Sequence, residues 1–131
     1  METAEILREM QAHLEEGWTK NALVHFLAFG GETVTMVCLQ GACLVARYGV
    51  KEWEEENDIE YWLAENQLVA DALAAVIREQ YPERLPGCYA SSALPSWSYV
   101  IFFNDSEHTT FEDVMSVVGK AIVNEEARVD A

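Results

Sequence analysis

Three side chains of this 131-residue chain could together perform nucleophilic chemistry. Thr35 is a residue type that caps helices, so a helix beginning there would place Cys38 in its first turn, where unpaired amides and the helix dipole lower the pKa of a thiol. A nucleophilic cysteine also needs a base and an orienting group, and His25 with Asp105 or Asn104 could supply them if their segments converge. These residues predict a thiol-dependent hydrolase or transferase that uses Cys38, His25 and Asp105.

A structural interpretation of the same residues competes with the catalytic one. Cysteine is among the most buried residue types, so Cys38 and Cys43 could be small apolar core residues. His25 shares a predicted strand face with apolar side chains, where a neutral histidine with one hydrogen bond is the ordinary case. No family-specific sequence signature surrounds Cys38. We therefore treat the thiol enzyme as the alternative to a binding function.

A second set of residues has side chains that could bind a metal ion. Asp105, Glu107 and His108 lie close together at a predicted turn, and oxygen with imidazole ligands suits several divalent cations. These residues are too few and too irregularly spaced to form a known metal motif. We expect no metal and no cofactor, and interpret His108 as a solvent-facing turn residue.

The strongest functional signal is a stretch in which carboxylates alternate with aromatic side chains. Its members are Glu52, Trp53, Glu54, Glu55, Glu56, Asp58, Tyr61 and Trp62. Exposed carboxylates would attract a basic protein at long range, and aromatic side chains supply much of the binding energy at interfaces. The competing interpretation is that these carboxylates precede a helix, where they offset the positive end of its dipole and keep the domain soluble. We predict protein binding, with an inhibitor or a mimic of DNA charge as one form of it.

These residues are held by a predicted α+β domain. Residues 97–103 are aromatic, β-branched and apolar on both alternating faces, which predicts a central strand. A polar turn at 104–106 follows, and then Thr109 and Glu112 have the spacing of a capping box for a helix that ends near Val123. The end from about 124 is predicted to be acidic, frayed and solvated.

The earlier part of the chain predicts three helices and a hairpin. Residues 4–16 carry an apolar stripe at helical spacing, a second helix is expected from Thr35 to about Gly49, and a third ends near Tyr81. Gly30 and Gly31 separate two strand-like runs and predict a β-hairpin. We therefore expect one domain over 1–131, in which a small antiparallel sheet, made of the hairpin and the central strand, is covered by about four helices.

Composition narrows the possible partners and the compartment. The net charge of −15 argues against direct binding of nucleic acid, because phosphates would be repelled. The longest nearly apolar run, from Met36 to Ala46, is too short to cross a membrane, and residues 1–5 lack the pattern of a secretory signal. Three cysteines, an odd number, suggest reduced thiols. We expect a cytoplasmic protein, in the host cytoplasm if a phage encodes it.

Several short pieces of the chain resemble the recurring motifs of one uncharacterised family of small proteins from actinobacteria and their phages. Residues 16–19 match a Gly-Trp-Thr motif, 37–42 match Cys-x-x-Gly-Ala, and 103–105 with 110–114 match Trp-Asn-Asp leading to a Thr-headed helix. This sequence departs from the family in having Phe103 in place of the Trp. The resemblance implies an actinobacterial or phage origin and no particular activity.

Overall fold

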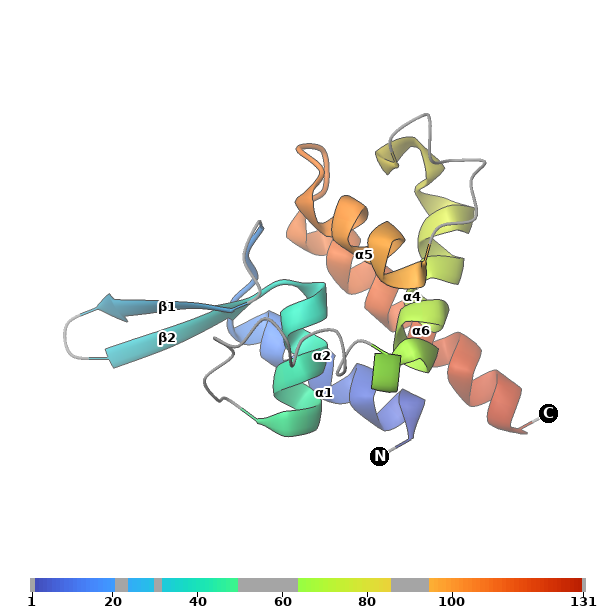
Figure 1. Ribbon diagram of the computed structural model, residues 1–131, viewed down its shortest axis with the longest axis horizontal. Helices are drawn as coiled ribbons and strands as arrows, with labels where there is room; N and C mark the ends of the chain where they lie inside the picture. Colours follow the sequence, from blue (N-terminus) through green and yellow to red (C-terminus); the bar gives the residue numbers. More distant parts are fainter. Residues whose placement is uncertain (1, 21–23, 30–31, 50–63, 86–94, 131) are drawn as a thin grey trace.

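The computed structural model describes residues 2–20, 24–29, 32–49, 64–85 and 95–130, and this part of the protein is mainly helical (Figure 1). In chain order the elements are α1 (Thr3–Glu16), β1 (Val24–Phe29), β2 (Glu32–Val37), α2 (Leu39–Tyr48), α4 (Gln67–Gln80), the 3₁₀ helix η1 (Pro82–Arg84), α5 (Ser96–Asp105) and α6 (Phe111–Asp130).

The amphipathic helices form where their apolar spacing predicts. The buried residues of α1 are Ile6, Leu7, Met10 and Leu14, which recur at three- and four-residue steps. The stripe predicted for the third helix is likewise buried in α4, at Val69, Leu73, Val76 and Ile77. Such a stripe places its side chains on one face of a helix, so burying that face against neighbours stabilises the helix.

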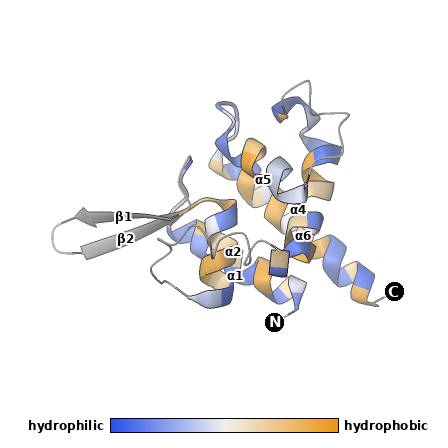
Figure 2. Cartoon of the chain, viewed as in Figure 1, coloured by the Kyte–Doolittle hydropathy of each residue, from blue (hydrophilic) through white to orange (hydrophobic). Residues whose placement is uncertain are grey.

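The core lies between two groups of packed helices. α1 contacts α2 and α6, while α4 contacts α5 and α6, so the long C-terminal helix joins both groups. Fully buried side chains come from every one of these helices, for example Leu7, Leu39, Leu73, Phe103 and Val118. Figure 2 shows apolar and hydrophilic stretches alternating along the helices, as expected when each helix has one buried face.

The predicted central strand at 97–103 is wrong, because these residues belong to helix α5. Its buried residues include Trp97, Val100 and Phe103, which are three residues apart, while Ile101 is 36% exposed. A short run that is apolar throughout has no clear period, so it cannot distinguish a buried strand from a buried helix. The helix is stabilised by packing against α4 and against the ring of Tyr81. The centroids of the Tyr81 and Phe103 rings are 5.2 Å apart.

The predicted α+β fold with a central sheet is therefore wrong as well. The hairpin itself forms: β1 and β2 pair antiparallel in a register that runs from Val24 opposite Val37 to Phe29 opposite Glu32. The described residues contain no further strand in this sheet, and the hairpin extends to one side of the helices instead of lying inside them (Figure 1). The helices supply most of the core, to which β2 adds Val37 at its end, so the described part of the protein is mainly helical with an appended hairpin.

Helix α6 begins one residue later and ends later than its sequence pattern predicts. The capping box uses Thr110 and Asp113: the Asp113 amide donates to Thr110 Oγ1 at 3.2 Å, and the Thr110 amide donates to Asp113 Oδ2 at 3.1 Å. The helix continues past Val123 to Asp130. The ion pairs Arg128–Glu125 and Arg8–Glu126 support this extension. The spacing of apolar residues, on which the prediction rests, does not reveal such ion pairs.

Candidate functional site

The side-chain amide of Asn104 is the centre of the most connected polar group in the described structure. Asn104 is 2% exposed and lies near the end of α5. Its Oδ1 accepts hydrogen bonds from Trp18 Nε1 at 2.8 Å and from the Leu39 amide at 3.1 Å. Its Nδ2 donates to the Thr19 carbonyl at 3.2 Å and to Asp105 Oδ1 at 3.0 Å. We call Trp18, Thr19, Cys38, Leu39, Asn104 and Asp105 the Asn104 cluster.

Backbone hydrogen bonds hold two of the cluster's three segments together. The Thr19 amide donates to the Val37 carbonyl at 3.0 Å, and the Val37 amide donates to the Gly17 carbonyl at 2.9 Å. This short parallel bridge attaches the segment after α1 to the end of β2, immediately before α2. Asn104 adds α5 from the far part of the chain. The Gly-Trp-Thr, Cys-x-x-Gly-Ala and Asn-Asp pieces singled out in the sequence therefore meet in space.

Cys38 is the N-cap of α2 and does not lie within its first turn. The helix begins at Leu39, Thr35 lies in β2, and the Gly41 amide donates to Cys38 Sγ at 3.2 Å. Burial raises the pKa of the Cys38 thiol to about 11; the negative charge of Asp105 adds to this, while the Gly41 and Gln40 amides oppose it. Since the thiolate is the nucleophile, this neutral thiol is suited to capping a helix more than to attacking a substrate.

The structure brings two of the three predicted catalytic residues into one cluster. Asp105 is hydrogen-bonded to the Asn104 amide and is near enough to influence Cys38 electrostatically. His25 lies in β1, where it pairs with Met36 in the hairpin register. Asn104, considered earlier only as a possible orienting group, is instead the residue that organises the cluster.

The predicted partner-binding residues lie outside the described part of the chain. They are Glu52, Trp53, Glu54, Glu55, Glu56, Asp58, Tyr61 and Trp62, and the description resumes at residue 64. The prediction that this stretch binds a partner stays a prediction.

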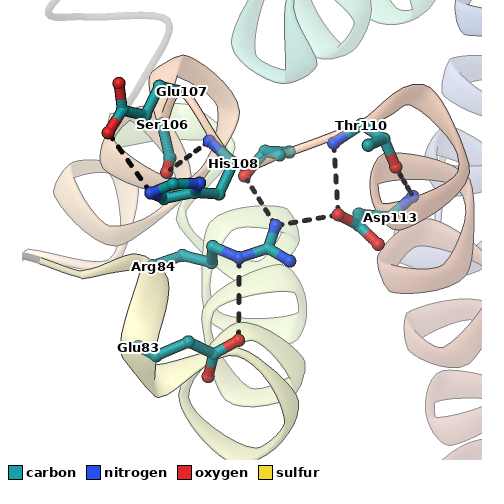
Figure 3. Close-up of polar contacts among 8 residues, drawn as sticks. Glu83, Arg84, Ser106, Glu107, His108, Thr110 and Asp113 are labelled. Carbon is teal, nitrogen blue, oxygen red and sulfur yellow. Dashed lines mark hydrogen bonds and ion pairs between the residues drawn. The ribbon is translucent and has the colours of Figure 1, made fainter.

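A second polar cluster, absent from the sequence predictions, surrounds Arg84 of η1 (Figure 3). Arg84 Nη1 donates to Thr109 Oγ1 at 3.2 Å and to Asp113 Oδ2 at 2.8 Å, and its guanidinium lies 5.2 Å from the centroid of the Tyr81 ring. Burial acts to raise the pKa of Asp113, but hydrogen bonds from Arg84 and the Thr110 amide outweigh it and hold that pKa below its ordinary value. The cluster fastens η1 to the start of α6.

Near this cluster, the residues considered for a metal ion make a simpler contact. His108 Nε2 lies 3.2 Å from Glu107 Oε1, and both side chains are largely exposed. Within the described ranges, no group of three or more histidine, cysteine, aspartate or glutamate side chains is arranged to hold a metal ion. Two surface hollows, of about 400 and 370 Å³, share no residue with the Asn104 cluster.

Most cations of the described residues contact a carboxylate, a carbonyl or an aromatic ring of the same chain. Arg8 pairs with Glu126, Arg84 with Asp113, and Lys20 Nζ donates to the Ser106 carbonyl at 2.6 Å. Arg47, Arg78 and Arg128 likewise contact a carboxylate or an aromatic ring. The exposed carboxylates of α1 are Glu5, Glu9, Glu15 and Glu16. The solvent-facing surface is thus dominated by negative charge.

Comparison with known proteins gives one match. The model of a family of unknown function (DUF6197) matches residues 1–124 of the chain. No curated protein and no solved structure matches. Among the described residues, no helix has both the length and the apolar character needed to cross a membrane.

Proposed function

Because the chain belongs to DUF6197, a family of unknown function, we propose its function from its own residues: it binds a protein partner that has a basic surface. The contact surface in this proposal is the acidic and aromatic stretch from Glu52 to Trp62. Its carboxylates attract the partner at long range, and Trp53, Tyr61 and Trp62 are the anchors that become buried on contact.

The observation that carries the proposal is the distribution of charge. The chain has 23 acidic and 8 basic residues, and several of the described cations already pair with groups of the same chain. The uncompensated carboxylates produce a negative field that raises the rate of encounter with a basic protein. Glu52, Glu54, Glu55, Glu56 and Asp58 add the densest run of this charge, and it coincides with the aromatic side chains.

The thiol enzyme has weaker support. A catalytic Cys38 would need a lowered pKa, whereas its burial and the nearby Asp105 raise it. The hydrogen bond from the Gly41 amide to Sγ gives Cys38 a structural task at the start of α2.

The proposal extends to the biological setting. The resemblance of three short motifs supports an actinobacterial or actinophage origin, and the cysteine content supports a cytoplasmic location. The proposed partner must have a basic surface, and proteins that bind nucleic acid have one because they contact phosphates. A nucleic-acid-binding protein, occupied by the acidic surface in place of DNA, is thus the partner class we propose.

The test is a pull-down from an actinobacterial lysate with the tagged protein, at about 0.1 M and about 1 M salt. Because the Debye length falls from about 10 Å to about 3 Å between these concentrations, a partner held by exposed charges should be retained only at the lower one. Retained proteins are identified by mass spectrometry. We expect a specific basic protein, and a blank at low salt would contradict the proposal.

A pair of matched variants separates the proposed surface from net charge alone. One variant carries Glu54→Lys, Glu55→Lys and Glu56→Lys, and the control carries Glu5→Lys, Glu9→Lys and Glu16→Lys on the exposed face of α1. Both change the net charge equally. The first should lose the partner and the second should retain most of it, while Cys38→Ala should leave capture unchanged. Equal loss in both triple variants would show that the stretch has no special role.

A further inference from the structure

One region of this highly charged protein is almost free of charge. Residues 21–46 contain a single charged side chain, Glu32, whereas the whole chain has 31. Both strands of the hairpin lie in this region. The residues of β1 are Val, His, Phe, Leu, Ala and Phe, of which Val and the two Phe are types enriched in strands.

The backbone edges of the hairpin are not equivalent. β2 pairs with β1 on one side, and on the other side its end at Val37 pairs with Trp18. β2 also contacts α1 and α2. In the described part of the chain no strand pairs with the outer edge of β1, the edge that faces away from β2, and both strands extend beyond the helices (Figure 1). That edge presents a row of backbone amides and carbonyls able to pair with another strand.

A hairpin of two strands that stands alone is only marginally stable in water, and further strands or packing against a helix usually stabilise it. β2 has such helix contacts, whereas no strand of the described residues pairs with the far edge of β1. We propose that the outer edge of β1 pairs antiparallel with β1 of a second copy of this chain, so that the two hairpins form one continuous four-stranded sheet across a two-fold axis. Such a two-fold axis pairs each strand with its own copy in antiparallel orientation, so the interface closes and needs no other partner.

The charge distribution favours a second copy over a basic partner at this edge. Two molecules of charge −15 repel each other, and the repulsion is smallest where the facing segments carry no charge. A basic partner would find no carboxylate on β1 to pair with. The dimer edge and the acidic stretch of the proposed function therefore involve different residues and should respond to salt in opposite ways.

The first measurement is sedimentation of the full chain from micromolar to millimolar concentration at low and high salt. We expect a species with about twice the chain mass of 14.8 kDa, and a larger dimer fraction at high salt because screening weakens the repulsion. A chain that remains monomeric throughout, or one that forms larger assemblies than a dimer, would overturn the proposal.

Lysine variants test whether β1 is the interface. Phe26→Lys and Leu27→Lys place a charge at neighbouring strand positions, which alternate between the two faces. Each should weaken dimerisation by roughly tenfold or more, because it adds one lysine from each copy to the new strand pair, and these like charges repel most strongly at positions near the two-fold axis. Each lysine also lowers the net negative charge of the chain. An increase in the overall repulsion between two copies therefore cannot explain a loss of dimer. The control Thr33→Lys lies on β2 opposite Ala28 and should keep the dimer; a dimer that all three variants leave intact would refute the role of β1.

A cysteine scan along β1 detects the pairing directly. Positions 24–29 are replaced one at a time and oxidised, with the unsubstituted chain as background for its own cysteines. Around a two-fold axis only the positions nearest the axis meet their own copy within disulfide distance. Cross-linking should therefore peak at one or two adjacent positions, and uniform or absent cross-linking would contradict the arrangement. A monomer that still captures a basic protein would overturn this inference alone, while a dimer with no partner would overturn the proposed function alone.

Discussion

Replacing Asn104 with alanine should destabilise the protein more than any single exposed substitution, because the Asn104 side chain joins its own helix to two other segments of the chain. In Asn104→Ala the buried Leu39 amide loses its side-chain acceptor, the Trp18 indole N–H loses its acceptor at 2.8 Å, and the Thr19 carbonyl loses a donor. The Leu39 amide belongs to the first residue of α2, so the change also leaves one orphan amide at the start of that helix uncapped.

The size of the effect follows from these lost bonds. A buried donor left without a partner costs about 1–3 kcal/mol, and the partly buried Trp18 and Thr19 groups should add less because water reaches them. We expect a loss of about 2–4 kcal/mol in the free energy of unfolding, a large part of the roughly 5–15 kcal/mol typical of a domain. For a chain of this size, that loss corresponds to a fall of roughly 8–15 °C in the melting temperature.

Urea unfolding followed by circular dichroism measures the loss, with Asn124→Ala on the exposed part of α6 as the matched control. The control should change stability by less than about 0.5 kcal/mol. A double-mutant cycle with Trp18→Phe adds a sharper test, since that change should cost less in the Asn104→Ala background than alone. If Asn104→Ala costs no more than Asn124→Ala, or if the two cluster changes are additive, the cluster does not hold the segments together as argued.

Two further predictions concern the ionisable groups. Because the folded protein lowers the pKa of Asp113 below its ordinary 3.8, the charged carboxylate stabilises the fold above about pH 4, and this contribution is lost as the pH falls through the lowered pKa. Asp113→Asn should therefore cost about 1 kcal/mol near neutral pH and flatten the acid limb of a stability curve against pH. The exposed neighbour Glu112→Gln serves as the control and should change stability near neutral pH by less than about 0.5 kcal/mol. Burial raises the pKa of Cys38 to about 11 and that of Cys43 to about 12, so in a Cys88→Ser background iodoacetamide should label the native protein slowly at pH 7 and rapidly only in denaturant. Labelling of the native form at the rate of a free thiol would show that at least one of the two remaining thiols, Cys38 or Cys43, is accessible and reactive.

The sequence predicts an element correctly where its apolar residues recur with a clear helical period or where glycines mark a turn. The stripe Ile6, Leu7, Met10 and Leu14 predicts α1, because those positions share one helical face that must be buried. The hairpin follows from two strand-like runs on either side of Gly30 and Gly31, and its antiparallel register confirms it. Both features depend on residues that are close in sequence.

The misassigned elements are those whose local pattern allows two solutions. Residues 97–103 are apolar on every side, so they could be a buried strand or a buried helix, and the neighbouring α4 selects the helix. Two overlapping capping boxes, Thr109 with Glu112 and Thr110 with Asp113, precede α6. Arg84 binds the side chains of both Thr109 and Asp113, and it lies 25 residues before Thr109. Thr109 is buried and its hydroxyl accepts from Arg84, while Thr110 is the residue that caps the helix.

Some features of the candidate site follow from the sequence, and others depend on the tertiary structure. The sequence by itself determined the net negative charge, the placement of the uncharged hairpin region and the acidic, aromatic stretch, because these properties need only the order of residues. Only the tertiary structure decided that Cys38 caps α2 and that Asn104 joins Trp18, Thr19 and Leu39. The amide of Leu39 is satisfied by a side chain 65 positions away, and the burial that keeps the Cys38 thiol neutral comes from packing, so neither property is written in the residues beside them.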